Sequence, residues 1–229
     1  MNARRPMENS AALQVREVFY TLQGEGPYGG RPAVFVRLTG CNLQCTFCDT
    51  VWDDVKDPYY VPSALVDDIA AQAHATKLVV LTGGEPLRQN VLPLIMQLGE
   101  RGFTVQVETA GTYWHKGLEF CKNLALVCSP KTQHIHPMVQ RCCYHWKYVL
   151  AADDVSPVDG LPRGGTQLLP QFHAPWRPPE WRRQDTVWVS PCDAGSAEGS
   201  SLNTQAAVKV CLQYGYRLNL QQHKIVGVR

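Results

Sequence analysis

The sequence contains no long apolar run and carries almost no net charge. None of its stretches approaches the ~20 consecutive apolar residues that a membrane-spanning helix needs. The net charge is only +2, so charge gives no reason to expect a nucleic acid or a membrane as a partner. No apolar segment follows the arginines at positions 4 and 5, and we therefore expect no secretory signal. With nine cysteines in the chain, these absences favour a reducing cytoplasm.

The cysteines also show a gap, because three of them lie close together and no fourth follows nearby. Cys41, Cys45 and Cys48 have the spacing Cys-x3-Cys-x2-Cys. A closed zinc site needs four ligands, and an ordinary 4Fe–4S cluster takes four thiolates. The next histidine, His74, lies too far along the chain for zinc-finger spacing. Three thiolates on one loop can instead hold three corners of an iron–sulfur cubane and leave one iron open to a small chelating molecule.

The six remaining cysteines are scattered, which is typical of small buried apolar side chains. They are Cys121, Cys128, Cys142, Cys143, Cys192 and Cys211. For the triplet itself, buried apolar thiols and a structural zinc site stay open as alternatives at this point.

Length and composition predict one globular domain. The 229 residues, 45% apolar and 18% charged, suffice for one substantial α/β domain with a buried core. We expect residues 1–14 to form a flexible N-terminal tail and residues 15–229 to form the single domain.

Short apolar runs alternate with glycine-rich loops and helical patterns along the chain. The runs predicted as strands are 15–22, 33–38, 77–81, 103–107, 124–127, 146–150, 186–189 and 216–221. Helices are predicted at 63–74, with Ser63 as the cap and Ala70 on the buried face, and at 91–101 and 204–214. Such repeated units predict a parallel sheet with crossover helices.

Polar and glycine-rich residues gather after the predicted strands rather than before them. In a β/α barrel this places them on the carboxyl face, where active sites lie. About six core strands are present, fewer than the eight of a closed barrel. We therefore predict an α/β fold with an open, partial β/α barrel of about six parallel core strands. Residues 153–185, rich in Pro, Gly, Gln and Arg, read as a long irregular crossover.

Two motifs resemble the radical S-adenosylmethionine superfamily. Its signature has the same cysteine spacing with an aromatic residue before the last cysteine, where this chain has Phe47. The run Gly83-Gly84-Glu85-Pro86 follows a predicted strand on the same barrel face and is similar to the element that binds the methionine amino group. Glycine lets backbone carbonyls approach such a group closely. Alone, the glycine pair would indicate only a tight turn.

Further motifs narrow the resemblance to the 7-carboxy-7-deazaguanine synthase family. Residues 21–26 (TLQGEG), 37–41 (RLTGC), 48–50 (CDT), 82–86 (TGGEP), 108–112 (ETAGT), 129–131 (SPK) and 223–224 (HK) occur in the family's order. The resemblance extends from about residue 15 to residue 229. It implies a carbon–nitrogen lyase that converts 6-carboxy-5,6,7,8-tetrahydropterin to 7-carboxy-7-deazaguanine with loss of ammonia, in queuosine and 7-deazapurine biosynthesis.

The chemistry implied by the resemblance uses a 4Fe–4S cluster, S-adenosylmethionine and Mg²⁺. The open iron chelates the amino and carboxylate groups of S-adenosylmethionine, and one-electron reduction gives a 5′-deoxyadenosyl radical that removes hydrogen from C6 of the pterin. The family also implies a homodimer and an electron donor such as flavodoxin. The alternatives are a glycyl-radical activating enzyme, which shares the cysteine spacing, and a non-catalytic iron–sulfur or zinc protein.

The resemblance carries site residues over position by position. It implies substrate contacts by Leu22, Gln23, Gly24, Glu25, Arg37, Thr82, His223 and the terminal carboxylate of Arg229. A carboxylate such as Glu25 can accept two parallel N–H bonds, and the Arg37 guanidinium offers a fork for the substrate carboxylate. Without the resemblance, Glu25 would read as a solvated turn residue and Arg37 as half of an ion pair.

The cofactor residues follow in the same way. Contacts to S-adenosylmethionine are implied for Phe47, Cys48, Asp49, Gly84, Ser129, Pro130, Lys131, Ser190, Pro191, Cys192 and Asp193. Cys41, Cys45 and Cys48 would ligate the cluster, and the Thr50 hydroxyl would ligate Mg²⁺, a metal that prefers oxygen ligands. On its own, Thr50 would more simply cap the following turn.

Overall fold

The computed structural model describes residues 10–48, 56–164 and 173–228. Within these residues the centre of the molecule is a nine-stranded sheet of order β3-β1-β2-β4-β5-β6-β7-β8-β9. The strands are β1 Leu13–Leu22, β2 Pro32–Leu38, β3 Tyr59–Tyr60, β4 Leu78–Gly83, β5 Thr104–Thr109, β6 Leu124–Cys128, β7 His145–Leu150, β8 Val187–Pro191 and β9 Arg217–Leu218. When the short strand β3 is left out of the order, each strand lies beside the strand that precedes it in the chain.

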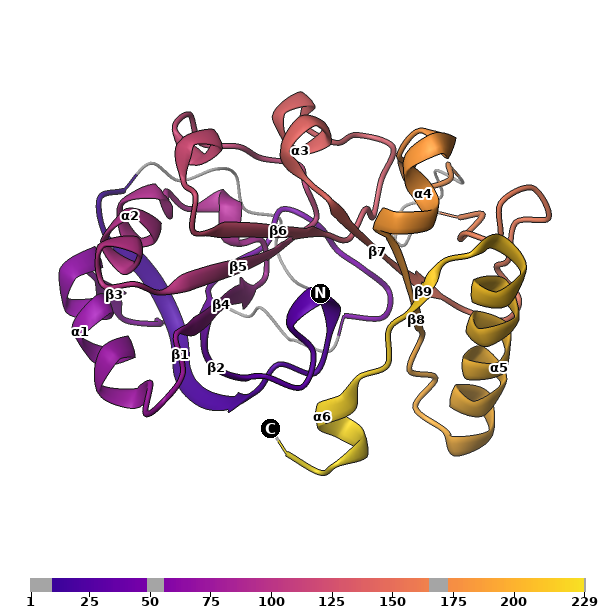
Figure 1. The fold of residues 1–229 in the computed structure, drawn as a ribbon, viewed down its shortest axis with the longest axis horizontal. Coiled ribbons are helices and arrows are strands. Elements are labelled where there is room, and N and C mark those ends of the chain that lie inside the picture. The colour runs from indigo at the N-terminus through magenta and orange to yellow at the C-terminus, as the bar shows by residue number, and fades with distance from the viewer. Residues whose placement is uncertain (1–9, 49–55, 165–172, 229) are drawn as a thin grey trace.

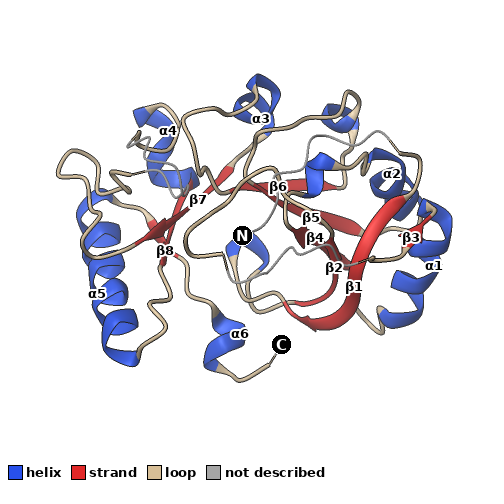
Figure 2. Ribbon diagram, turned by 180° about the vertical axis from the view of Figure 1, so that it is seen from behind, coloured by secondary structure: helices blue, strands red, loops and turns tan. Residues whose placement is uncertain are grey.

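The sheet is an open, partial barrel, as the sequence predicts. Strands β2 and β4 to β9 are parallel to one another. Strand β1 is antiparallel to β2, and β3 is antiparallel to β1. Figures 1 and 2 show the sheet curving through a wide arc whose two ends do not pair. The six predicted core strands are therefore present, with β9 as a short seventh parallel strand.

Helices cover the outer side of the arc. They are α1 Pro62–Gln72, α2 Leu92–Glu100, α3 Pro137–Cys142, α4 Glu180–Thr186, α5 Ala197–Tyr214 and α6 Gln222–Ile225, with 3₁₀ turns η1 Gly26–Tyr28, η2 Pro86–Arg88 and η3 Leu118–Phe120. In Figure 1, α1 and α2 lie at one end of the arc and α5 at the other. Among the α-helices of the described residues, only α6, near the C-terminus, lies on the open side.

The core divides into two parts because side chains along a strand alternate between the two faces of the sheet. The larger cluster lies between the sheet and the helices, where β2 and β4 meet α1 through residues such as Val36, Leu81 and Leu65. A smaller cluster of Ala33, Leu78 and Val80 faces the inside of the arc, where Tyr28 of η1 packs against it. The inner face therefore carries an apolar cluster of its own on β2 and β4.

Several element boundaries differ from the sequence prediction. Strand β1 begins at Leu13, which is fully buried, two residues inside the predicted tail. Ser63 does not cap α1, because Pro62 already occupies its first turn and the cap position is Val61. Ala70 is exposed rather than buried. Helix α5 begins at Ala197, because Ser196 accepts a hydrogen bond from the backbone N–H of Gly199 at 3.2 Å and caps it.

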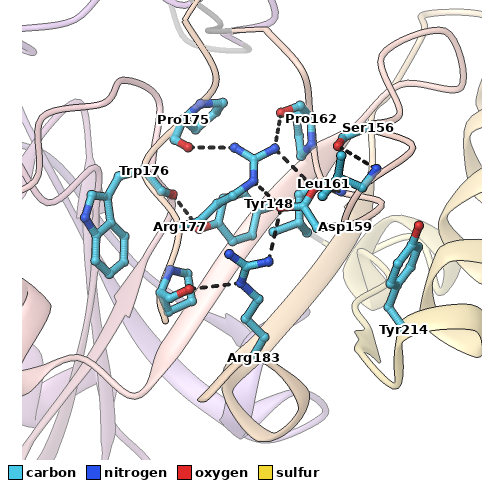
Figure 3. A network of polar contacts seen from close by, with 12 residues as sticks. Tyr148, Ser156, Asp159, Leu161, Pro162, Pro175, Trp176, Arg177, Arg183 and Tyr214 are labelled. Atoms are coloured by element: carbon cyan, nitrogen blue, oxygen red, sulfur yellow. Dashed lines mark hydrogen bonds and ion pairs between the residues drawn. The ribbon is translucent and has the colours of Figure 1, made fainter. Parts of the chain in front are cut away.

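The crossover after β7 is irregular, as predicted, but α4 interrupts it and a buried ion-pair cluster fastens it. Asp159, whose side chain is 8% exposed, lies 2.5 Å from Arg177 and 3.3 Å from Arg183 (Figure 3). Arg177 also donates to the carbonyl oxygens of Pro162 and Pro175, each at 2.8 Å. Residues 151–164 are thus tied to residues 173–186 by the side chain of Asp159.

Candidate active site

A cleft of about 550 Å³ opens where the parallel strands end. Its walls come from the loops that follow β2, β4, β5, β6 and β8, from the residues before η1, and from the segment around α6. The predicted site residues that line it are Glu25, Arg37, Cys41, Cys45, Phe47, Cys48, Thr82, Gly84, Ser129, Lys131, Ser190, Pro191, Cys192 and Asp193. Lys147 and Val149 of β7 line it as well, so residues from eight separate stretches of sequence meet in one place.

The three cysteines of the triplet share one wall of this cleft. Burial raises the pKa of the Cys41 thiol to about 12; Glu85 and the two neighbouring thiols add to the rise, while the N–H of Leu43 opposes it. In the part of the chain that the structure describes, no three His, Cys, Asp or Glu side chains converge as a preformed metal site. Three soft thiols that open onto one cleft nevertheless form the donor set of an iron–sulfur cluster, so the residues present fit one.

The loop that carries the cysteines is anchored at both ends. The Thr39 hydroxyl donates to the carboxylate of Asp57, across the whole loop. Gln89 donates to the carbonyl of Thr39 at 3.2 Å, and Gln14 donates to the carbonyl of Asp57 at 3.2 Å. Thr39, Asp57, Gln14 and Gln89 are all at most 8% exposed. The base of the cysteine loop is therefore fixed by buried hydrogen bonds from β1 and from the residues after η2.

The glycine pair brings the end of β4 directly against the end of β2. Gly83 has φ +128°, and a Cβ there would overlap the backbone of Leu38. A Cβ on Gly84 would overlap the carbonyl oxygen of Gly40. The backbone N–H of Glu85 donates to that same carbonyl at 3.0 Å. Only glycine fits these two positions, and the close approach sets Gly84 beside Cys41 at the cleft.

Glu85 of the same motif points away from the cleft. Its side chain is fully buried and accepts hydrogen bonds from the Leu87 N–H at 2.9 Å, the Thr109 hydroxyl at 2.7 Å and the Ala110 N–H at 2.7 Å. Burial raises its pKa, and these three donors act in the opposite direction. Glu85 therefore joins the loops after β4 and β5, and its side chain does not line the cleft.

A row of three charged side chains lies at the inner wall of the cleft: Glu25, Lys147 and Glu108, called here the Glu25–Lys147–Glu108 row. The Lys147 ammonium forms an ion pair with Glu25 and lies 3.7 Å from Glu108. The side chains of Glu25, Lys147 and Glu108 are 11%, 12% and 20% exposed. Gln221 also donates to Glu25 at 2.8 Å. An ammonium between two carboxylates gives the row a net charge of −1.

The partners of the row fix its protonation and its position. Burial alone would raise the pKa of Glu25, but the charge and hydrogen bond of Lys147, with Gln221 and His223, lower it to about 2. Glu108 accepts from Gln23 at 3.0 Å and from Gln106 at 2.9 Å. Glu25 is thus a carboxylate at neutral pH, and the far end of the row is held by two amides.

Lys147, Glu108, Gln221 and Lys224 line the cleft although sequence reasoning assigned them no role. A signal existed for Lys147, because it is the one Lys, Arg, Asp or Glu residue within the strand sequence His-Trp-Lys-Tyr-Val-Leu. Glu108 belongs to a motif quoted for the family, but nothing in that motif indicates that its side chain faces inward. Gln221 follows the two-residue strand β9 and gives no local signal.

Arg37 both forms an ion pair and lines the cleft. Its Nε donates to Glu17 at 2.7 Å, and the two side chains are 26% and 25% exposed. Thr82 lies directly opposite Arg37 in the parallel register of β2 and β4. Glu17 therefore orients the guanidinium toward the same wall that Thr82 occupies.

The opposite wall carries a lysine over an aromatic ring. Lys131 Nζ lies 4.8 Å from the centre of the Phe47 ring and donates to the Ser129 hydroxyl at 2.7 Å. Burial lowers the pKa of Lys131. Ser190 accepts from Asn219 at 2.7 Å, and the exposed Asp193 pairs with Lys224 at 2.7 Å. This wall offers cationic and hydroxyl groups beside the cysteine loop.

Of the predicted site residues that the structure describes, Leu22, Gln23, Gly24, Pro130 and His223 do not line the cleft. Leu22 pairs with Pro32 in the sheet, Gln23 lies behind the wall, and Pro130 is also set back. His223 packs on Gly24 so closely that a Cβ there would overlap its ring. The backbone N–H of Gln222 donates to the carbonyl of Gly24 at 3.1 Å, which fixes this contact. Asp49, Thr50 and Arg229 lie outside the described residues.

Comparisons with known proteins give one consistent result. A family model described as the Radical SAM superfamily matches residues 35–129. A 7-carboxy-7-deazaguanine synthase from Rhodospirillum rubrum is 43% identical over 222 residues, 95% of this chain and 93% of that protein. A protein of the same name from Rickettsia prowazekii is 32% identical over 94% of this chain and 88% of its own length. The crystal structure of QueE from Escherichia coli matches the fold with a TM-score of 0.69, at 24% identity, over 93% of this chain and 96% of that one.

Proposed function

The chain belongs to the 7-carboxy-7-deazaguanine synthase family of the radical S-adenosylmethionine superfamily, and we propose that the cleft described above is its active site. The reaction of this family converts 6-carboxy-5,6,7,8-tetrahydropterin to 7-carboxy-7-deazaguanine with loss of ammonia, a step in the biosynthesis of queuosine. The observation that carries the assignment is the single cleft shared by the cysteine loop, the Gly83–Gly84 edge and the side chains of Glu25 and Arg37, each held by its own ion pair.

The pterin is proposed to lie between Glu25 and Arg37. The Glu25 carboxylate, ionised through its contact with Lys147, can accept the two parallel N–H bonds of the 2-amino and N3 groups. Arg37, oriented by Glu17, can bind the substrate carboxylate as a bidentate fork, with Thr82 beside it. Leu22, Gln23 and Gly24 support this wall from behind, and His223 and the terminal carboxylate of Arg229 are proposed to close it.

S-adenosylmethionine is proposed to lie on the side of the cysteine loop. Phe47, Cys48, Asp49 and Gly84 would contact it from one side, and residues 129–131 and 190–193 from the other. The cluster held by Cys41, Cys45 and Cys48 supplies, when bound, the electron that cleaves S-adenosylmethionine. The protein's own part is to hold the two substrates in one orientation and to exclude water from the radical reaction.

Several further features of the family are proposed for this chain. The Thr50 hydroxyl would ligate Mg²⁺ near the substrate carboxylate. The enzyme would act as a homodimer in the cytoplasm and take its electron from a donor such as flavodoxin. None of the described helices is long and apolar enough to cross a bilayer.

The function is tested by anaerobic turnover. The purified protein is reconstituted with iron and sulfide, then incubated with dithionite, S-adenosylmethionine and 6-carboxy-5,6,7,8-tetrahydropterin. We expect about four irons per chain, with 5′-deoxyadenosine and 7-carboxy-7-deazaguanine as products by mass spectrometry. Cys45→Ala should abolish iron uptake and product, whereas Cys142→Ala, outside the cleft, should change neither. A protein that carries the full cluster and cleaves S-adenosylmethionine but yields no deazaguanine would refute the proposed substrate.

A further inference from the structure

The Glu25–Lys147–Glu108 row places a hydrogen-bond donor beside a pair of acceptors at the cleft. Lys147 and Glu25 form an ion pair, and both side chains line the cavity while remaining about nine-tenths buried. The ammonium carries three N–H donors and no acceptor, whereas the carboxylate carries only acceptors. The wall therefore presents acceptor, acceptor and donor functions within one ion pair.

The far side of the row keeps the ammonium in this place. Glu108 lies 3.7 Å from Lys147 Nζ and is itself held by the amides of Gln23 and Gln106. Gln106 is fully buried, and Gln23 is 2% exposed. Lys147 thus lies between two anchored carboxylates, which limits the positions its ammonium can take.

This pattern is complementary to one edge of a 2-amino-4-oxopyrimidine ring. That edge presents the 2-amino group and N3–H as donors and the 4-oxo oxygen as an acceptor, in this order. Two parallel N–H groups suit the oxygens of one carboxylate. The third position then needs a donor, and the ammonium beside that carboxylate is a charged one.

We propose that Lys147 is a specificity determinant that donates a hydrogen bond to the 4-oxo oxygen of the pterin and so selects a strong hydrogen-bond acceptor at position 4. The inference rests on the proposed function, because it assumes that a pterin occupies the cleft with its amino edge against Glu25. A 4-thioxo analogue keeps the 2-amino and N3–H donors that face Glu25 but offers only a weak acceptor at position 4. The ammonium would then lose most of a charge-assisted hydrogen bond in a buried site, which costs affinity.

The experiment compares two inert ligands on the reconstituted enzyme with S-adenosylmethionine, under anaerobic conditions at pH 7.5. The ligands are 6-carboxypterin and its 4-thioxo analogue, 2-amino-4-thioxo-3,4-dihydropteridine-6-carboxylate, which have a fully oxidised pyrazine ring and no hydrogen at C6 to abstract. Dissociation constants are measured by isothermal titration calorimetry. For the unmodified enzyme we expect the 4-oxo ligand to bind roughly 10-fold more tightly, which corresponds to most of one charge-assisted hydrogen bond.

Lys147→Met removes the donor and keeps most of the side-chain length, so the ratio of the two dissociation constants should fall to about 1. Lys147→Gln keeps a neutral N–H donor without the charge, so the ratio should lie between that of Lys147→Met and that of the unmodified enzyme. Lys209→Met, at an exposed position on α5, is the matched control and should keep the full preference.

The ratio of the two dissociation constants shows whether Lys147 contacts the ligand itself or only holds Glu25 in place. If Lys147 only holds Glu25 in place, both ligands weaken equally in the variants and the ratio stays unchanged, which overturns the proposal. An unmodified enzyme that binds both ligands equally also overturns it. An enzyme that binds neither ligand contradicts the proposed function instead, so the two failures are distinguishable.

Discussion

The two halves of the barrel build the cleft in different ways. From β1 to β5 the contributions come from contiguous loops, and regular helices α1 and α2 join the strands. From β7 to β9 one loop, residues 190–195, is joined by single side chains such as Lys147 and Gln221, and an irregular crossover connects β7 to β8. The first half relies on backbone close approach at Gly83 and Gly84, whereas the second relies on buried polar pairs such as Asp159 with Arg177.

This difference explains why the glycine motifs of the first half can be recognised from the sequence, whereas single side chains of the second half such as Lys147 and Gln221 cannot. A loop that must pass close to another backbone requires glycine at fixed positions, so its sequence is short and specific. A side chain that reaches into a cleft from a strand needs only the correct face of that strand. Three predictions test whether the two halves depend on these separate devices.

The largest effect is expected from breaking the second half at Asp159. Asp159→Asn should lower the free energy of unfolding by about 3 kcal/mol, near the lower end for breaking a buried ion pair, because Arg177 keeps two carbonyl partners. Urea denaturation measures the change. The matched control is Asp67→Asn, which breaks the exposed pair with Arg101 in the first half, where the side chains are 68% and 47% exposed. That change should cost less than about 1 kcal/mol. Equal losses in the two variants would show that Asp159 does not secure the crossover.

A smaller and more local effect is expected in the first half from Gly84→Ala. The added Cβ would overlap the carbonyl of Gly40, so the start of the cysteine loop must shift, at a cost of about 1 to 3 kcal/mol. Iron content after reconstitution should fall with it, because Cys41 is attached directly to Gly40. Gly29→Ala is the control, since a Cβ there meets its nearest atom, the Gly26 carbonyl oxygen, at an ordinary 3.4 Å. Full cluster loading in Gly84→Ala would contradict the close-approach argument.

The third effect concerns the contact between the halves and appears only in acid. Glu25 has a pKa of about 2 in the folded protein, below its ordinary value of 4.5, because burial is outweighed by Lys147. A depressed pKa adds stability above pH 4.5, and this stability is lost as the pH falls toward 2. Unfolding free energies between pH 6 and pH 2.5 should therefore fall more steeply for the unmodified protein than for Lys147→Met. Parallel curves would mean that Lys147 does not stabilise the Glu25 carboxylate.

The fold was largely predictable from sequence because its strands are apolar runs bounded by glycine and polar loops. The run 33–38 corresponds to β2 within one residue, and 124–127 corresponds to β6 within one residue. Helix boundaries were less predictable. Ser63 looked like a cap, yet Pro62 is already the first residue of the helix, so the helix begins before Ser63. The short helices α3, α4 and α6 were not predicted, since four to seven residues carry too little periodicity.

The site was predictable where motifs of the family mark its residues. Fourteen of the predicted residues line the cleft, among them Glu25, Arg37 and the three cysteines. The charged partner of Glu25 was not found, because Lys147 is 122 residues away and only the pairing of β7 with its neighbours turns it inward. The structural role of Glu85 was also not apparent, since a carboxylate in a family motif suggests a contact with a ligand. In the structure this carboxylate instead accepts three hydrogen bonds from within the protein.

The strand order has a consequence for how the chain folds during synthesis. Because each main strand from β2 onward pairs with the strand made before it, the sheet can grow from one end as the chain leaves the ribosome. The hydrogen bond from Gln221 to Glu25, however, joins residues 196 positions apart, and Asn219 meets the backbone N–H of Gly26 across 193 positions. Contacts of such separation form late, since a long loop must first be closed. We therefore expect a nascent chain that lacks its last strand to hold a nearly complete sheet. The side of the cleft that contains Glu25 would still lack its contacts to Asn219 and Gln221.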